Sequence, residues 1–324
     1  MSSRLLRARR FCSVTSFALV FLVSLALYHT TPEMTSTQHA ASEPFAEGKQ
    51  LSLIVDGKHA LYNIKKAFLP FTKSVVVLAQ PTTSGESGVA EDSASKSLVI
   101  VKIFDPRVLN DRTEAKPERP WTLAAELRAV QDRAREDFEW DDSVLYEDEP
   151  DADDIEGVAI RAAHWEQNFF HLTMQCYEAE RAAYERLHDL QGTVLPRLLG
   201  VGHWDAGPAA RAIQPPALVL EYVPSISLRD IAPELLDPAI CTSLVTVVDR
   251  FATNGVIHTD FNDGNVLFSP PERPQRAIVI DFGCAIVREG DTSDEEWNET
   301  VQFEGDSTWV RHILKKKGVE LPAL

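Results

Sequence analysis

The chain has 324 residues, enough for one large domain or two small ones with a sizeable core, and 44% hydrophobic and 25% charged residues are typical of a globular protein. Lysine and arginine number 32 against 49 acids, and the resulting net charge of −17 repels polyanions, so we exclude a nucleic-acid partner. The four cysteines show no CxxC pair and no metal-ligand spacing, which disfavours a zinc site and a disulfide framework.

The first thirty residues have the composition of a targeting segment. Four arginines precede an uncharged apolar run from Val14 to Tyr28. Bulky residues follow instead of a cleavage site, so the pattern favours a signal-anchor over a cleaved signal peptide, with an arginine-rich transit peptide as a third option. The sequence therefore predicts a membrane-associated or secretory-pathway protein that contacts the membrane through residues 11–28, or a cytoplasmic protein if this segment does not target the chain.

A linker over residues 31–48 is followed by runs of β-branched residues that predict an antiparallel sheet. Glycine, proline or serine bounds each run, as expected of strands. Lys102 stands among valines and isoleucines in the third run, where a buried ammonium costs stability unless carboxylates or phosphates hold it. The predicted strands are residues 51–57, 74–81 and 97–105, with another at 217–224.

Several helices follow from apolar residues at helical spacing and from Pro or Gly at the ends. Between the first two lies an acid-dense stretch, residues 136–156, which predicts a solvated, partly disordered insertion or, alternatively, a docking segment for a basic partner. The predicted helices are residues 120–140, 164–192, 227–236, 238–255 and a closing helix at 307–318.

The stretch "HTDFNDGN" brings short polar side chains together just before a strand. It places Asp260 two residues after His258 and five before Asn265, and Asp281 follows in "DFG" at the end of another apolar strand. An aspartate can orient an attacking hydroxyl and accept its proton, while an asparagine and a second aspartate supply hard oxygen ligands for magnesium. This spacing favours phosphoryl transfer from ATP.

The predicted partner of Lys102 is a carboxylate on the helix over residues 164–192. Glu180 is favoured because Tyr184 and Leu187 then fall on its packing side. Glu178 is the alternative, and the two glutamates lie about 200° apart around a helix, so only one of them can serve.

In this order, VIVK, a helix glutamate, LEY, HxDxxxxN and DFG resemble the protein-kinase-like fold, and the chain is similar to fungal protein-kinase-like proteins over roughly residues 50–290. The resemblance implies an α+β, bilobal fold with an antiparallel sheet in the N-lobe and a mainly helical, shortened C-lobe. The implied divisions are residues 1–30 for the targeting segment, 31–48 for the linker, 49–219 for the N-lobe and 220–324 for the C-lobe.

The same resemblance implies the roles of the site residues. Lys102 would contact the α- and β-phosphates and pair with Glu180, and Asp260 would be the catalytic base. Asn265 and Asp281 would bind Mg²⁺ and, with it, ATP. The hinge "LEYV", which includes Glu221 and Val223, would contact adenine through its backbone.

The chain also departs from the protein-kinase pattern. No GxGxxG occurs near residues 50–78, where Gly57 stands alone, so the cover over the phosphates differs from the usual one. Asn262 and Thr259 replace the lysine and arginine that protein kinases usually carry in the catalytic loop. Only 41 residues follow Gly283, and no APE motif occurs among them. These departures point to atypical or small-molecule kinases.

We therefore predict an ATP- and Mg²⁺-dependent kinase that transfers the γ-phosphoryl group to the hydroxyl of an unknown protein or small molecule. Two alternatives stay open from the sequence. One is a weak or inactive pseudokinase that acts as a binding scaffold, and the other is a small-molecule kinase of the aminoglycoside-phosphotransferase type.

Overall fold

The structure is a computed structural model that describes residues 41–82, 97–207 and 210–321. All the described helices and strands belong to one compact unit, residues 36–324. The predicted targeting segment and most of the predicted linker lie outside the described residues.

The helices of the structure correct the predicted localisation. Within the three described ranges, no helix combines the length and the apolar composition that a bilayer crossing requires. Residues 11–28, from which the anchor was predicted, are outside those ranges. We therefore do not retain the membrane or secretory assignment.

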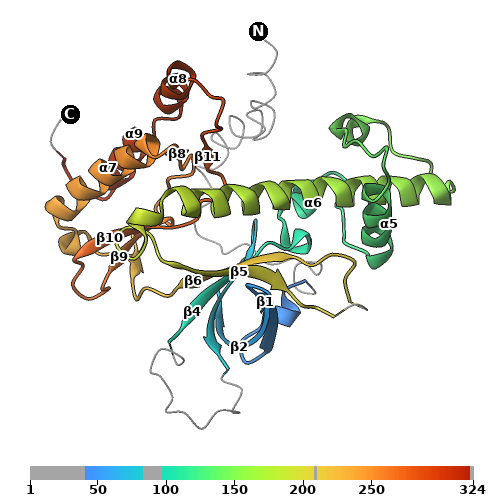
Figure 1. Cartoon of the computed structure of the whole chain (residues 1–324), viewed down its shortest axis with the longest axis horizontal. Helices are drawn as coiled ribbons and strands as arrows, with labels where there is room; N and C mark the ends of the chain where they lie inside the picture. Colours follow the sequence, from blue (N-terminus) through green and yellow to red (C-terminus); the bar gives the residue numbers. More distant parts are fainter. Residues whose placement is uncertain (1–40, 83–96, 208–209, 322–324) are drawn as a thin grey trace. The chain divides into compact units, whose positions relative to one another are not determined.

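Six strands between residues 50 and 221 of this unit form a closed antiparallel barrel (Figure 1). Alternate residues such as Leu53, Val77 and Val101 are buried inside it, and Phe45 packs against Trp204 in the same core. The predicted antiparallel sheet is confirmed. The strands, in their order around the barrel, are β1 (Gln50–Val55), β2 (Lys58–Ala67), β3 (Val75–Pro81), β4 (Val99–Ile103), β6 (Pro216–Glu221) and β5 (Leu198–Trp204).

Two strands of the barrel, β2 and β5, were not predicted. Asp56 and Gly57 both have positive φ, 49° and 75°, which makes them the centre of a two-residue hairpin rather than the end of a strand. Strand β5 was not predicted because it contains glycines, which are not typical of a strand. One of them, Gly202, is required, because a Cβ there would lie 1.9 Å from the carbonyl oxygen of Ile54 where β1 and β5 close the barrel.

A long helix, α6 (Ile155–Arg186), runs past the barrel, with α5 (Leu123–Arg133) packed beside its amino-terminal part (Figure 1). Helix α6 begins nine residues before its predicted start because the Asp154 side chain caps it by accepting from the Gly157 N–H at 2.9 Å. In the acid-dense stretch Glu149 pairs with Arg119, and the stretch ends in this cap. Its partial disorder stays a prediction.

The carboxyl-terminal part is mainly helical and holds two small sheets. Residues 227–236, predicted as a helix, instead form a short strand, a turn and a 3₁₀ turn at Pro233–Leu235. The Ser227 hydroxyl bonds the Asp230 carboxylate at 2.6 Å and closes that turn. The helices of this part are α7 (Pro238–Thr253), α8 (Asp294–Glu304) and α9 (Asp306–Lys316). A further short helix, α4 (Asp111–Glu114), lies earlier in the chain, between β4 and α5. The strands are β7 (Ile226–Ser227), β9 (Val266–Ser269) and β10 (Arg276–Val279) in one sheet and β8 (Val256–Ile257) and β11 (Ile286–Val287) in the other.

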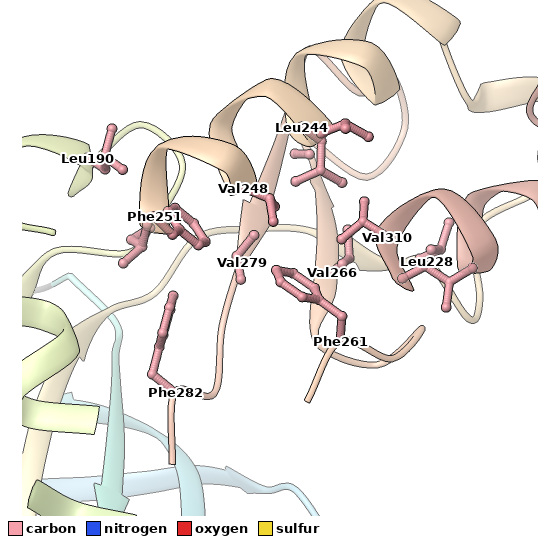
Figure 2. Packing of buried hydrophobic residues seen from close by; sticks show 14 of the residues in the cluster. Leu190, Leu228, Leu244, Val248, Phe251, Phe261, Val266, Val279, Phe282 and Val310 are labelled. Atoms are coloured by element: carbon pink, nitrogen blue, oxygen red, sulfur yellow. The ribbon is translucent and has the colours of Figure 1, made fainter. Parts of the chain in front are cut away.

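The core of this part lies between α7, α9 and the β9–β10 hairpin (Figure 2). Phe251 of α7 contacts Phe282, with ring centroids 5.7 Å apart, and both are fully buried. Phe261 is anchored in the same core. The two loops that carry the polar residues thus each insert a phenylalanine into one hydrophobic cluster, which holds the loops side by side.

Candidate active site

Lys102 is the centre of the polar site. It lies in β4 between Val76 of β3 and Leu218 of β6, and it is 6% exposed. Its Nζ is 2.5 Å from Oε2 of Glu180 and 2.6 Å from Oδ1 of Asp281. Burial opposes the charge of this ammonium, but the two carboxylates override it and raise the pKa of Lys102, so the side chain is a cation.

Helix α6 brings Glu180 to Lys102. Glu180 is 1% exposed, whereas Glu178 faces solvent. Tyr184 and Leu187, one and two turns further along, are fully buried on the same side, as predicted. Glu180 and not Glu178 is therefore the partner that the geometry selects.

Asp260 and Asn265 lie together in the loop between β8 and β9. The Asn265 amide donates to the backbone carbonyl of Asp260 at 2.9 Å and to its Oδ2 at 3.1 Å. Burial and the nearby charge of Asp281 raise the pKa of Asp260, although Asn262 and Asn265 donate to it. A carboxylate with a raised pKa is a stronger base when it is ionised.

Asp281 and Asn265 have the donor atoms that a magnesium ion prefers. The Asn265 amide nitrogen is used within the loop, which turns its carbonyl oxygen away from Asp260. The Asp281 side chain keeps 48% of its surface exposed, although one oxygen contacts Lys102. Mg²⁺ takes few protein oxygens and keeps several waters, so these residues fit the ion. Among the described residues, no cluster of three or more His, Cys, Asp or Glu side chains is arranged as a metal site.

His258 braces the two loops. Its Nε2 donates to the carbonyl of Ile280, 3.0 Å away, and its Nδ1 accepts from the Asp260 N–H at 3.3 Å. The ring stacks on Phe261 with centroids 4.3 Å apart and meets Phe282 edge-on at 4.7 Å. Both nitrogens of a neutral ring are therefore satisfied in a fully buried position.

The buried His258 predicts a loss of stability in acid. Burial lowers its pKa to about 4, from 6.5 in an unfolded chain. The unfolded chain thus binds the extra proton, so this stabilisation is complete above pH 6.5 and is lost as the pH falls toward 4, by roughly 3 kcal/mol in all. Between pH 7.5 and 5, urea unfolding should show the wild type losing about 2 kcal/mol more than His258→Phe. An equal loss in both proteins would contradict a neutral, buried His258.

Asp306, the first residue of α9, was not predicted as part of the site. Its carboxylate accepts the N–H groups of His258 at 2.6 Å and Thr259 at 3.0 Å. Thr259 has φ 62°, a strained conformation for a β-branched residue, and its hydroxyl also donates to the Cys284 carbonyl at 2.7 Å. Burial raises the pKa of Asp306 to about 6. Asp306 was missed because, in the sequence, it resembles the other acidic residues at the starts of helices.

The predicted hinge residues do not join this cluster in any contact between the described residues. The Glu221 N–H donates to the Arg197 carbonyl at 2.9 Å, and the Glu221 carboxylate accepts from Arg197. The carbonyl of Val223 accepts from the Ser225 hydroxyl at 2.9 Å. The N–H of Glu221 is thus engaged with Arg197, the residue before β5, and the role of both hinge residues toward adenine stays a prediction.

Comparisons with known proteins identify a family for the chain. Residues 123–287 match the family described as the phosphotransferase enzyme family, a range that contains Glu180, Asp260 and Asp281 but begins after Lys102. The serine/threonine-protein kinase rio2 of Schizosaccharomyces pombe is 34% identical over 65 residues, 20% of this chain and 18% of that protein. The chain therefore matches less than a fifth of that relative's length.

Two solved structures of the Rio2 kinase from Chaetomium thermophilum are also similar to the chain. One is described as an ADP/Mg²⁺-phosphoaspartate complex. Each has a TM-score of 0.41, the identities are 13% and 14%, and the likeness covers 96% of this chain and 71% and 73% of the other chains.

The α+β fold, with an antiparallel N-lobe and a shortened helical C-lobe around a buried lysine, is that of an atypical protein-kinase-like protein. Because the family match extends over half of the sequence, the chain belongs to the phosphotransferase enzyme family.

Proposed function

We propose that this protein transfers the γ-phosphoryl group of ATP to a hydroxyl acceptor in a Mg²⁺-dependent reaction. The observation that carries the proposal is the convergence of Lys102, Glu180 and Asp281 within hydrogen-bonding distance, beside the Asp260–Asn265 pair. A cation for the phosphates, oxygen ligands for a metal and a carboxylate base are the groups that phosphoryl transfer needs.

Each residue has a defined part in the proposed step. Asp260 orients the acceptor hydroxyl and takes its proton as the oxygen–phosphorus bond forms and the bond from the γ-phosphorus to ADP breaks. Lys102, fixed by Glu180, holds the α- and β-phosphates. Asn265 and Asp281 would hold Mg²⁺, which neutralises charge on the phosphates.

A small-molecule acceptor is the second candidate, and the match to the phosphotransferase enzyme family over residues 123–287, from α5 to β11, favours it. A binding scaffold without catalysis is the remaining alternative, supported by the uncharged Asn262 beside Asp260.

Transfer of label from γ-³²P-ATP separates these possibilities. The full chain is incubated with Mg²⁺ and either a panel of hydroxylated small molecules, aminoglycosides included, or generic proteins such as casein, with Asp260→Asn as the control. Label that moves to an acceptor only with the wild type supports an enzyme and identifies the acceptor class. No transfer to any acceptor, together with retained ATP binding, would favour the scaffold.

A further inference from the structure

The loop between β2 and β3, residues 68–74, occupies the end of the barrel where Lys102 lies. Val75, the first residue of β3, is directly opposite Ile103, the neighbour of Lys102. With strands about 4.8 Å apart and a rise of about 3.3 Å per residue, the backbone of Lys73 lies within roughly 11 Å of that of Lys102. The Asp56–Gly57 turn, by contrast, joins β1 to β2 at the other end of β2 from this loop.

This loop contains no glycine and is held by side chains instead. Phe71 is buried in the barrel core near Phe45, with centroids 6.2 Å apart, and the carbonyl of Thr72 accepts from the Asn110 N–H at 3.0 Å. A glycine-rich loop would offer backbone N–H groups to phosphates. This loop has no glycine and is fixed by its side chains, so a side chain rather than the backbone has to contact the phosphates. Lys73 is the cationic residue of the loop.

Asp111, at the start of α4, holds the Lys73 ammonium in place. Nζ of Lys73 is 2.5 Å from Oδ2 of Asp111, and the lysine side chain is 47% exposed. An ammonium has three N–H donors, and Asp111 accepts one, so the same group is able to bind a phosphate oxygen as well.

Lys73 lies close enough to Cys176 of α6 and to Cys284, after the DFG segment, for their thiols to act on its charge. Partial burial lowers its pKa, but Asp111 and the thiols of Cys176 and Cys284 outweigh burial, and the net pKa is raised. Cys176 is one turn before Glu180, and Cys284 follows Gly283. At the junction of α6 with the DFG segment, a Cβ on Gly283 would lie 3.7 Å from both Cys176 and Glu180. The same Cβ would lie 3.4 Å from Oδ1 of Asp281, so Asp281 also borders this junction.

We propose that Lys73 binds the terminal phosphates of the nucleotide. Its ammonium replaces the backbone N–H groups that a glycine-rich loop would offer to the phosphates, and it supplies a positive charge that Asn262 lacks. The inference rests on the proposed function, because it needs a nucleotide beside Lys102. Charge-assisted hydrogen bonds to phosphate are among the stronger ones in proteins, so the effect is measurable.

Calorimetric titration of the full chain with Mg²⁺-ATP and with adenosine tests the inference. Lys73→Ala should weaken Mg²⁺-ATP binding about tenfold and leave adenosine binding unchanged, while Lys73→Arg keeps most of the affinity. The matched control is Lys65→Ala, which removes the same charge from an exposed position in β2 and should change neither titration.

The outcomes separate this inference from the function on which it rests. If wild type binds Mg²⁺-ATP but Lys73→Ala resembles Lys65→Ala, or if Lys73→Ala weakens adenosine equally, Lys73 is not a phosphate ligand and the proposed function is untouched. If wild type binds no Mg²⁺-ATP, the proposed function and the inference fall together.

Discussion

Replacing Asp260 by asparagine should reduce the rate of phosphotransfer by about a hundred- to ten-thousandfold, the range for loss of a general base. The amide is as large as the carboxylate and removes the repulsion by Asp281 that contributes to the raised pKa of Asp260, so the fold should persist. Initial rates with γ-labelled ATP, paired with thermal unfolding of the same preparations, measure both effects.

Asp263 provides the matched control in the same loop. Its carboxylate forms an exposed pair with Arg229 at 2.9 Å, so Asp263→Asn should leave the rate unchanged. Equal rate losses in the two variants would mean that removing any charge from this loop lowers the rate. That result would contradict the role of Asp260 as the general base.

Replacing Lys102 by methionine should destabilise the folded chain by about 3–5 kcal/mol and abolish catalysis. The cause is the Glu180 carboxylate, 1% exposed, which is left buried without its cation. Chemical denaturation of Lys102→Met, Glu180→Leu and the double variant measures the coupling.

The double variant should be more stable than Lys102→Met alone, because it removes the Glu180 carboxylate together with the Lys102 ammonium and leaves neither charge buried without its partner. A Lys102→Met protein within about 0.5 kcal/mol of the wild type would be inconsistent with a desolvated ion pair, since surface substitutions have effects of that size.

The site residues could be predicted because local sequence constrains them. Asp260 and Asn265 share one loop, so their spacing alone brings them together. Glu180 was separable from Glu178 because helical geometry puts the two on different faces, and the buried Tyr184 marks the correct one. Lys102 was evident as a charge inside an apolar strand. Its contact with Asp281, 179 positions later, comes from the tertiary fold.

The elements that were missed depend on contacts far apart in sequence. Strand β5 contains glycines that weaken strand propensity, and one of these, Gly202, is required by the approach of Ile54. Residues 227–236 carry apolar side chains at helical spacing, but a turn closed by Ser227 and Asp230 replaces the helix. Asp306 holds the loop that carries Asp260 from 48 positions away, and nothing local distinguishes it from other acids at the starts of helices. The domain boundaries stay predictions.

Metal-dependent stabilisation by ATP tests most directly whether Asn265 and Asp281 hold one divalent ion beside the Lys102 ammonium. The melting temperature of the wild type should rise by a few kelvin with ATP and Mg²⁺ and by much less with ATP and a chelator. Asp281→Ala should lose the magnesium-dependent part of the rise. A rise of the same size with and without magnesium, or one that Asp281→Ala retains in full, would contradict the shared metal site.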